Sequence, residues 1–347
     1  MLTGLLKSFF IHAGPFSVVR ALQRIKKGPC ISILYGHRVL PDEVIANQAD
    51  SRTITGQTSV SEVWCAIQEL RKFYTIISMD EAVAQIKNGH IKTDSVVLTF
   101  DDGFQDNFTH LYPLLKKHNI PATYYVNSSV ISTKNSLWFQ SIINYFFAVR
   151  EASVFVSFSN RTYDLSTATK RYESAFHFMR YLQANYKPEE FHSIIESVAG
   201  ELRFPNEDDL HMTWEDLKEL SKDPLITIGA HSYNHYPLGF CDEKLSSYEI
   251  NQSINELENH LGYKIVHFSY PRGHQEDFNQ HHIDCLKSKQ IISAVSTIRG
   301  VNRKGEDLHR LRRVGLPQNV SKAKADFIWH VGGLPELVKS IKSKRAN

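Results

Sequence analysis

Short apolar runs alternate with longer amphipathic stretches along most of the chain. The runs predict buried strands at residues 31–35, 75–78, 96–100, 122–126, 225–230, 265–270 and 291–295. Apolar stripes at helical spacing between these runs predict helices at residues 59–73, 80–88, 107–118 and 214–220, and a further helix from Ser246. At least six strand-helix units follow one another, which favours an α/β fold of the (β/α) barrel type over an open sheet.

Two of these helices open on capping-box patterns, in which a serine precedes a glutamate by three positions. These are Ser59-x-x-Glu62 and Ser246-x-x-Glu249, each followed by an apolar stripe. Residues 133 to about 212 break the rhythm, because they are rich in aromatic residues and helix formers and hold only a hairpin pattern near 154–163. We therefore expect a helical N-terminal arm over residues 1–29, a barrel over 30–316 with a mostly helical insertion at about 133–212, and a basic tail over 317–347.

The strand at residues 96–100 ends in two adjacent carboxylates, Asp101 and Asp102, followed by Gly103. Two buried acids side by side cannot both ionise cheaply unless a cation neutralises one of them, so the pair predicts a metal or a shared proton. A second strand, at residues 225–230, is followed by His231 and His235, whose imidazoles can reach one point in space. One carboxylate and two histidines predict an open site for a divalent metal.

Composition and charge narrow the function classes. A formal net charge of +3, spread over 40 basic and 37 acidic residues, is too small to indicate nucleic-acid binding. The four cysteines have no Cys-x-x-Cys spacing, which favours free thiols in a reducing, cytoplasmic compartment. Apolar residues beside basic runs at both ends leave two interpretations open: peripheral contact with the inner face of a membrane, or terminal helices packed on the barrel with their cations in water. No run is long enough to span a bilayer, and no motif indicates an obligate protein partner.

Three motifs, taken together, resemble a known family. Thr99-Phe100-Asp101-Asp102-Gly103, His231-Ser232-Tyr233-Asn234-His235 and Pro271-Arg272-Gly273 resemble the first three motifs of the NodB-homology polysaccharide deacetylases, carbohydrate esterase family 4. The resemblance covers roughly residues 30–315 apart from the insertion. It implies a deformed barrel of about seven strands that removes acetyl groups from amino sugars with a divalent metal. We expect Zn²⁺, with Co²⁺, Ni²⁺ or Mn²⁺ as alternatives, and an acetylated glycan or sugar-lipid precursor as substrate.

The resemblance also implies roles for individual residues. Asp101 matches the general base, and Asp102, His231 and His235 match the metal ligands. In the third motif, the backbone N–H of Arg272 matches the group that stabilises the oxyanion with the metal. Its neighbours Tyr270, Pro271 and Gly273 would shape the substrate and oxyanion side of the site.

The sequence departs from the commonest family pattern in two places. Ser269 stands where many members have an arginine that orients the base, a role that Arg312 or Arg313 could take over. The late leucine-x-histidine that supplies the acid is also missing. In the poly-N-acetylglucosamine deacetylase branch a Tyr-His motif on the first strand supplies this acid, and Tyr35-Gly36-His37 resembles it with one extra glycine. His37 is therefore the candidate acid, and His274 is its alternative.

The expected function is a metal-dependent hydrolase that removes N-acetyl groups from amino sugars during the synthesis of cell-surface polysaccharide. Two alternatives stay open. The chain could remove an acyl or formyl group from a lipid-linked sugar, or it could be a catalytically silent carbohydrate-binding barrel. The second alternative gives no reason for an adjacent acid pair with two matching histidines.

Overall fold

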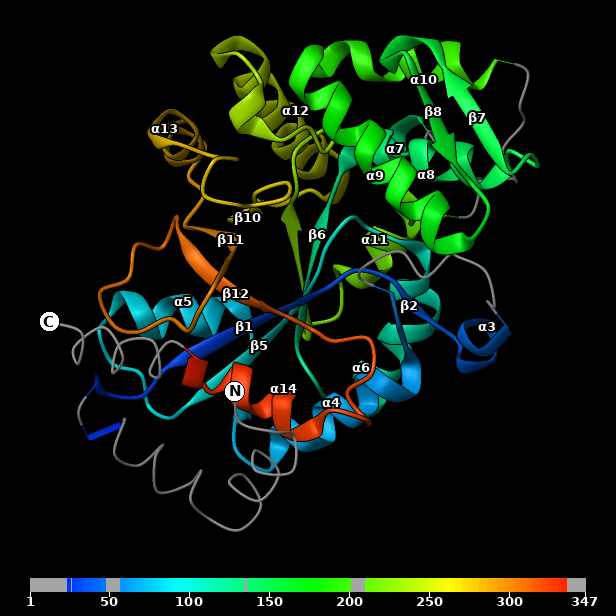
Figure 1. The fold of residues 1–347 in the computed structure, drawn as a ribbon. Coiled ribbons are helices and arrows are strands. Elements are labelled where there is room, and N and C mark those ends of the chain that lie inside the picture. Colours follow the sequence, from blue (N-terminus) through cyan, green and yellow to red (C-terminus); the bar gives the residue numbers. More distant parts are fainter. Residues whose placement is uncertain (1–23, 26, 48–56, 134–135, 201–209, 336–347) are drawn as a thin grey trace, which may run out of the picture.

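The computed structural model shows a closed parallel barrel and describes residues 24–25, 27–47, 57–133, 136–200 and 210–335. Neighbouring strands run in the order β1, β12, β11, β10, β9, β6, β5, and β5 pairs with β1 to close the barrel (Figure 1). These strands are β1 (Ile31–Gly36), β5 (Ser95–Phe100), β6 (Ala122–Val126), β9 (Ile226–Ala230), β10 (His267–Ser269), β11 (Ser293–Arg299) and β12 (Leu311–Gly315). A short strand, β4 (Thr75–Ile76), pairs with the start of β5. The predicted seven-stranded (β/α) barrel is confirmed.

Helices pack around the barrel because each carries one apolar face. They are α4 (Val60–Arg71), α5 (Met79–Lys87), α6 (Tyr112–Lys117), α11 (Trp214–Leu220), α12 (Glu243–Leu261), α13 (Gln280–Ser288) and α14 (Lys324–Val331). A π-helical turn, η1 (Asn107–Leu111), precedes α6. Shorter elements are β2 (Val39–Leu40), α3 (Asp42–Asn47), β3 (Thr58–Ser59), α7 (Ser128–Thr133) and the 3₁₀ turn η4 (Leu238–Phe240). Strand and helix side chains form one large core, exemplified by Ile67, Phe100, Tyr124, Ile254 and Phe268.

The segment between α7 and α11 forms a separate packed layer on one side of the barrel (Figure 1). It contains α8 (Trp138–Ala148), β7 (Ser153–Val156), η2 (Ser157–Ser159), β8 (Arg161–Asp164), α9 (Ala168–Asn185), η3 (Pro188–Glu190) and α10 (Phe191–Ala199). Strands β7 and β8 form an antiparallel hairpin. A second core holds these elements together, with Phe146, Phe178 and Phe191 fully buried. We call residues 136–200 the insertion from here on.

Of the two predicted helix N-caps, the structure confirms one and contradicts the other. Ser59 caps α4 as predicted, since its Oγ accepts from the N–H of Glu62 at 3.3 Å. The predicted cap at Ser246 is wrong, because α12 begins earlier and is capped by Asp242, whose Oδ1 accepts from the N–H of Leu245 at 2.8 Å. Ser246 is fully buried inside the helix. The apolar stripe therefore marked the helix correctly but not its first turn.

The ends of the chain are described only in part. The predicted N-terminal arm lies almost wholly outside the described residues, as do the last basic residues from 336 onward. In the predicted tail, the apolar side chains Phe327, Ile328, Val331 and Leu334 are buried in the barrel core. They are therefore not available to contact lipid. Among the described helices, none combines the length and apolar character that crossing a membrane requires.

Candidate active site

Asp101 and Asp102 lie directly after β5 and are both buried, with relative exposures of 2% and 3%. The N–H of Asp101 continues the ladder by donating to the carbonyl of Gly36 at 3.0 Å. Asp102 then leaves the strand with φ of 74°, a left-handed conformation that is strained for a residue with a side chain. The abrupt change of direction turns the two adjacent carboxylates toward different partners.

Arg313, from β12, holds the carboxylate of Asp101 in a bidentate ion pair. Its Nη1 and Nη2 each donate to one carboxylate oxygen at 2.8 Å, and its side chain is fully buried. Nη2 also donates to Ser269 Oγ at 3.0 Å, and that hydroxyl donates to Asp101 Oδ2 at 3.4 Å. Burial alone would raise the pKa of Asp101, but the guanidinium and nearby His231 outweigh it and bring the pKa to about 2. Asp101 is therefore held as an anion.

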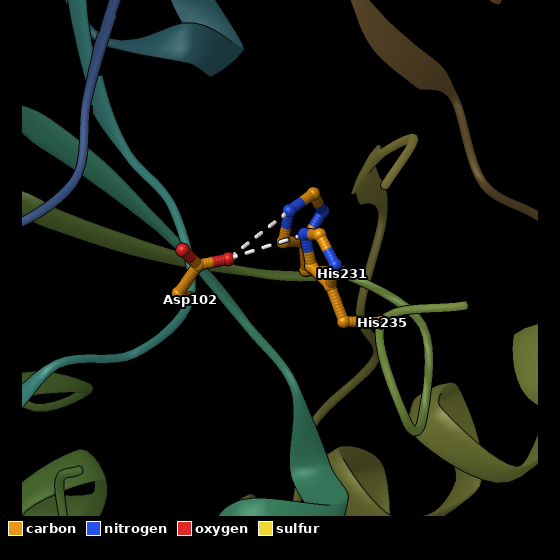
Figure 2. A group of neighbouring side chains, drawn as sticks. All are labelled: Asp102, His231 and His235. Carbon is orange, nitrogen blue, oxygen red and sulfur yellow. Dashed lines mark ion pairs between the residues drawn. The ribbon is translucent and has the colours of Figure 1, made fainter. Parts of the chain in front are cut away.

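Asp102, His231 and His235 form a cluster that faces one point (Figure 2). Asp102 Oδ1 lies 3.5 Å from His231 Nε2 and 3.4 Å from His235 Nε2. The three residues can each offer one ligand atom, and these atoms lie within 4.8 Å of one another. Asp102 precedes His231 by 129 residues in the chain. The predicted ligands meet because β5 and β9 end at the same face of the barrel.

Neighbouring backbone fixes how the two imidazoles point. His231 Nδ1–H donates to the carbonyl of Ser269 at 2.7 Å, which leaves the Nε2 lone pair directed at Asp102. The turn that carries His235 has left-handed residues at Ser232 and His235, with φ of 63° and 59°. Ser232 Oγ closes this turn by accepting from the N–H of His235 at 3.0 Å. Asn127 supports it from β6 by donating to the carbonyls of His231 and Ser232.

These three residues fit a divalent cation. Asp102 Oδ1 is buried without a hydrogen-bond donor among the described residues. Burial and the neighbouring Asp101 raise the pKa of Asp102 well above 3.8, which shows how unfavourable a second anion is here without a positive charge. Burial also lowers the pKa of His231 to about 4 and that of His235 well below 6.5, so both rings are neutral and can donate lone pairs. Two neutral imidazoles and one carboxylate are a donor set that Zn²⁺ and similar metals accept.

His37 lies just after β1 and lines the same cavity as the cluster. Its ring meets Tyr35 edge-on, with centroids 5.8 Å apart, and its buried Nδ1 has no partner among the described residues. Burial lowers the pKa of His37, although Asp101 acts against this. The following Arg38 anchors the turn, because its Nε donates to Asp106 Oδ2 at 2.8 Å. Asp106 lies only five positions beyond Asp101 but belongs to none of the three sequence motifs.

The third motif shapes the opposite side of the site. Arg272 is left-handed with φ of 58°, and Gly273 follows with φ of 66°. A Cβ on Gly273 would lie 2.8 Å from the backbone nitrogen of Thr297, so the tight turn requires glycine here. Pro271 is buried, and its carbonyl accepts from the N–H of Gly273 at 2.6 Å. Tyr270 stacks on Phe278 and donates its hydroxyl to the carbonyl of His309 at 3.0 Å, so that hydroxyl is engaged in the core.

A cavity of about 330 Å³ joins these groups to the insertion. Trp138 of α8 donates its Nε1–H to the carbonyl of His235 at 3.2 Å, and the Phe139 ring packs 4.9 Å from the His235 ring. Gln183 of α9 accepts from Arg272 Nη1 at 2.9 Å. The insertion therefore contacts both a candidate ligand and the third motif. Sequence spacing alone could not place it there, because the insertion has no fixed register with the strands.

A family comparison agrees with this geometry. Residues 88–290, more than half of the chain, match the sequence model of the polysaccharide deacetylase family. The chain belongs to this family. Polysaccharide deacetylases are hydrolases that act on the amide bonds of N-acetylated sugars, and they depend in general on a metal. The candidate base and the first candidate ligand lie within the matched segment, as do both histidines.

Solved structures of other proteins share the fold of this polysaccharide deacetylase. IcaB from Ammonifex degensii is 19% identical, with 87% of this chain and 97% of that chain covered and a TM-score of 0.56. A deacetylase from Streptococcus pyogenes, PplD in complex with acetate, is 17% identical, covers 84% and 94%, and has a TM-score of 0.54. A de-N-acetylase from Aggregatibacter actinomycetemcomitans is 16% identical, covers 86% and 99%, and has a TM-score of 0.53. No curated protein matches the chain significantly.

Proposed function

We propose that the chain is a metal-dependent deacetylase that hydrolyses the N-acetyl amide of an amino sugar in a polysaccharide or glycan precursor. The observation that carries the proposal is the division between two adjacent carboxylates. Arg313 neutralises Asp101 through two hydrogen bonds, whereas Asp102 faces two neutral imidazoles with an unpartnered oxygen. A binding protein has no use for this division, but amide hydrolysis needs both a base and a cation site.

Asp102, His231 and His235 would hold the metal, which lowers the pKa of water and polarises the acetyl carbonyl when it is bound. Asp101 is anionic and lines the same cavity, so it can accept the proton of the attacking water. Arg313 and Ser269 orient this carboxylate. Arg272 lines the same cavity in its strained turn, and its backbone N–H is the proposed donor to the oxyanion.

The leaving amine must receive a proton, and His37 is the proposed donor. It lines the cavity, and its buried Nδ1 has no partner among the described residues. His274 also lines the cavity, but it is exposed and its Nδ1 faces the Thr297 hydroxyl at 3.4 Å. We favour His37 because the nearby anion of Asp101 favours the protonated ring, against the effect of burial, and because its free Nδ1 lies at the cavity.

The substrate branch and the cellular site are the finer part of the proposal. The Tyr35-Gly36-His37 sequence on β1 supports a place near the poly-N-acetylglucosamine deacetylase branch, and IcaB shares the fold. We propose Zn²⁺ as the metal and a cytoplasmic enzyme of cell-surface polysaccharide synthesis. Contact with the inner membrane face would depend on the basic ends of the chain, which lie outside the described residues.

The proposal is tested by measuring bound metal and acetate release together. Purified full-length protein loaded with Zn²⁺ should release acetate from N-acetylated chitooligosaccharides, and a chelator should abolish the release until metal is returned. Asp101→Asn serves as the matched inactive control, since it keeps the side-chain shape and leaves the three ligands in place. Metal binding without acetate release from any acyl-sugar substrate would instead support the silent carbohydrate-binding barrel.

A further inference from the structure

One face of α9 forms a wall of the cavity that no catalytic role explains. Its side chains are Tyr172, Phe176, Met179, Arg180 and Gln183. Steps of four, three, one and three residues place them in one helical stripe. The stripe is aromatic toward the start of the helix and polar toward its end, where Gln183 accepts from Arg272 Nη1 at 2.9 Å. That hydrogen bond places the polar end of the stripe beside the third motif.

Phe176 and Arg180 form an exposed pair within this stripe. The Arg180 guanidinium lies over the Phe176 ring, 4.9 Å from its centroid, and 45% of Phe176 is exposed. A large aromatic side chain left this open at the edge of a cavity has unused apolar surface. A guanidinium stacked on a ring keeps its edge free to donate hydrogen bonds in the ring plane. The pair therefore offers an apolar surface and a cationic edge together.

The charges that line the cavity single out Arg180. Four arginines and two aspartates line it. Three of these arginines have carboxylate partners: Arg313 binds Asp101 at 2.8 Å, Arg38 binds Asp106 at 2.8 Å, and Arg272 lies 3.4 Å from Asp277. In the described part of the chain, no carboxylate lies within ion-pair distance of Arg180. Among the described residues that line the cavity, Arg180 is therefore the arginine whose charge a ligand could match.

We infer that Phe176 and Arg180 form a specificity-determining subsite that binds an anionic group next to the reacting amino sugar. The inference rests on the proposed function, because it names the class of substrate for the same site. The shared chemistry is a negative charge on the group that flanks the reacting amino sugar. Its source is either the phosphate of a glycosyl phosphate or the carboxylate of a neighbouring acidic sugar. The Phe176 ring packs against the apolar face of the flanking group.

The test measures equilibrium binding of deacetylated sugars, which the metal-loaded full-length protein cannot consume. One matched pair of probes is glucosamine 1-phosphate and methyl glucosaminide. The second pair is glucosamine linked to glucuronic acid and glucosamine linked to glucosamine. We expect at least one anionic probe to bind roughly 10- to 100-fold more tightly than its neutral partner, as for a hydrogen bond to a charged group. The probe that shows the preference identifies the source of the charge.

Arg180→Met should collapse this binding ratio toward one, and Arg180→Lys should retain part of it. The matched control is Arg161→Met, because Arg161 of β8 also stacks on a ring of the insertion, Tyr163 at 5.7 Å, but does not line the cavity. Arg161→Met should keep the wild-type ratio. Arg180 is exposed on a helix, so its variants should unfold at the wild-type temperature, which is checked by circular dichroism.

The binding measurement tests the subsite, and the acetate measurement tests the proposed deacetylase activity, so the two hypotheses can fail independently. If an anionic probe is preferred through Arg180 but no acyl sugar loses acetate, the subsite stands and the proposed deacetylase activity is wrong. If acetate is released but neither anionic probe is preferred, the activity stands and the subsite is wrong. If Arg180→Met still prefers the anionic probe, the subsite is also wrong, because the negative charge of the probe would then be bound elsewhere, for example at the bound metal.

Discussion

At the scale of single residues, the site depends on giving two adjacent aspartates opposite environments. Asp101 receives two guanidinium hydrogen bonds, and Asp102 receives none among the described residues. Both are buried, so the difference comes from their partners and not from exposure to solvent. The backbone makes this possible, since the left-handed φ of Asp102 turns it away from the strand direction that Asp101 follows.

The first prediction distinguishes the proposed role of Asp101 as base from that of Asp102 as metal ligand. Asp102→Asn should lower metal affinity and activity together, because a site with three protein ligands loses much of its affinity with one of them. Asp101→Asn should bind metal normally and lose roughly 10²- to 10⁴-fold in kcat. Metal content by atomic absorption and acetate release are measured on the same samples. Near wild-type turnover in Asp101→Asn would remove Asp101 as the base.

The second prediction concerns Arg313. Asp101 must be ionised to act as a base, and the guanidinium holds its pKa at about 2, so the wild-type rate should not fall until the pH is very low. Arg313→Met removes the charge and should raise this pKa, which moves the acidic limb of the kcat/KM profile to higher pH. Arg313→Lys keeps the charge without the bidentate geometry and should give an intermediate shift. An acidic limb at the same pH in all three proteins would contradict the role of Arg313.

The third prediction tests the proton donor. His37→Ala should lower kcat by roughly 10²- to 10⁴-fold with metal content unchanged. As an acid His37 must be protonated, and burial lowers its pKa, so the wild-type rate should decline with rising pH at a lower pH than an exposed histidine would give. That alkaline limb should disappear in the variant. If it persists in His37→Ala but disappears in His274→Ala, the donor is His274.

The site residues differ in how far the sequence could place them. The spacing within each motif predicted that Asp101, Asp102, His231 and His235 would lie close together, because residues that end parallel strands meet at one face, and in the structure they do. Arg313 could not be distinguished from Arg312 in the same way. Only the register of β12, in which Arg313 lies beside Ile33 and faces Asp101, decides which of the two arginines points inward.

At the scale of elements, the apolar strands were predictable and β12 was not. Its five residues, Leu311–Gly315, include two arginines, which obscure the apolar pattern of a buried strand. Arg312 is exposed, and Arg313 is buried in an ion pair with Asp101. An ion pair therefore stands where an apolar contact would have marked a buried strand in the sequence. The strand that closes the barrel is thus also the strand that delivers a charge to the site.

Helix α12 supports the histidine turn through a buried acid. Glu249 Oε2 accepts from the N–H of Asn234 at 2.7 Å, and Oε1 accepts from its side-chain amide at 2.8 Å. Burial raises the pKa of Glu249 to about 7 from an ordinary value of 4.5, although these hydrogen bonds lower it. The unfolded chain therefore releases this proton at a lower pH than the folded protein does, and the folded state loses stability as the pH rises through this interval.

The fourth prediction follows from that interval. Between pH 5 and pH 7 the free energy of unfolding of the wild type should fall relative to that of Glu249→Gln, by up to about 3 kcal/mol. Below pH 4.5 the two proteins should depend on pH in parallel, because Glu249 is then protonated in both states. Urea unfolding at several pH values measures the difference. Parallel curves across the whole range would show that Glu249 does not titrate as proposed.

At the scale of the whole molecule, the barrel supplies the reactive groups and the insertion supplies a wall of the cavity. The insertion has its own apolar core, yet Trp138 and Gln183 connect it to His235 and Arg272. Its composition predicted mostly helical structure, and the structure contains three helices and a hairpin in residues 136–200. Its placement over the site could not be predicted, because that depends on contacts between segments that share no periodic pattern.

The fifth prediction concerns contact with a membrane surface, which the basic ends of the chain were expected to provide. The apolar side chains of α14 are buried in the barrel, so they cannot insert into lipid, and the attraction tested at this end is that of charge. Lys339, Lys342, Lys344 and Arg345 follow this helix in the sequence. Each surface cation contributes about 1 kcal/mol toward an anionic leaflet, and salt screens the attraction.

Full-length protein should therefore sediment with anionic phosphatidylserine vesicles at low salt and dissociate near physiological ionic strength or above. Replacing the four C-terminal cations by glutamine should abolish most of this binding while leaving activity on a soluble substrate unchanged, because none of them has a proposed role in catalysis. Neutral phosphatidylcholine vesicles are the control. Binding that persists at high salt would require an apolar insertion that α14 cannot supply, and binding that persists in the glutamine variant would point instead to the N-terminal cations.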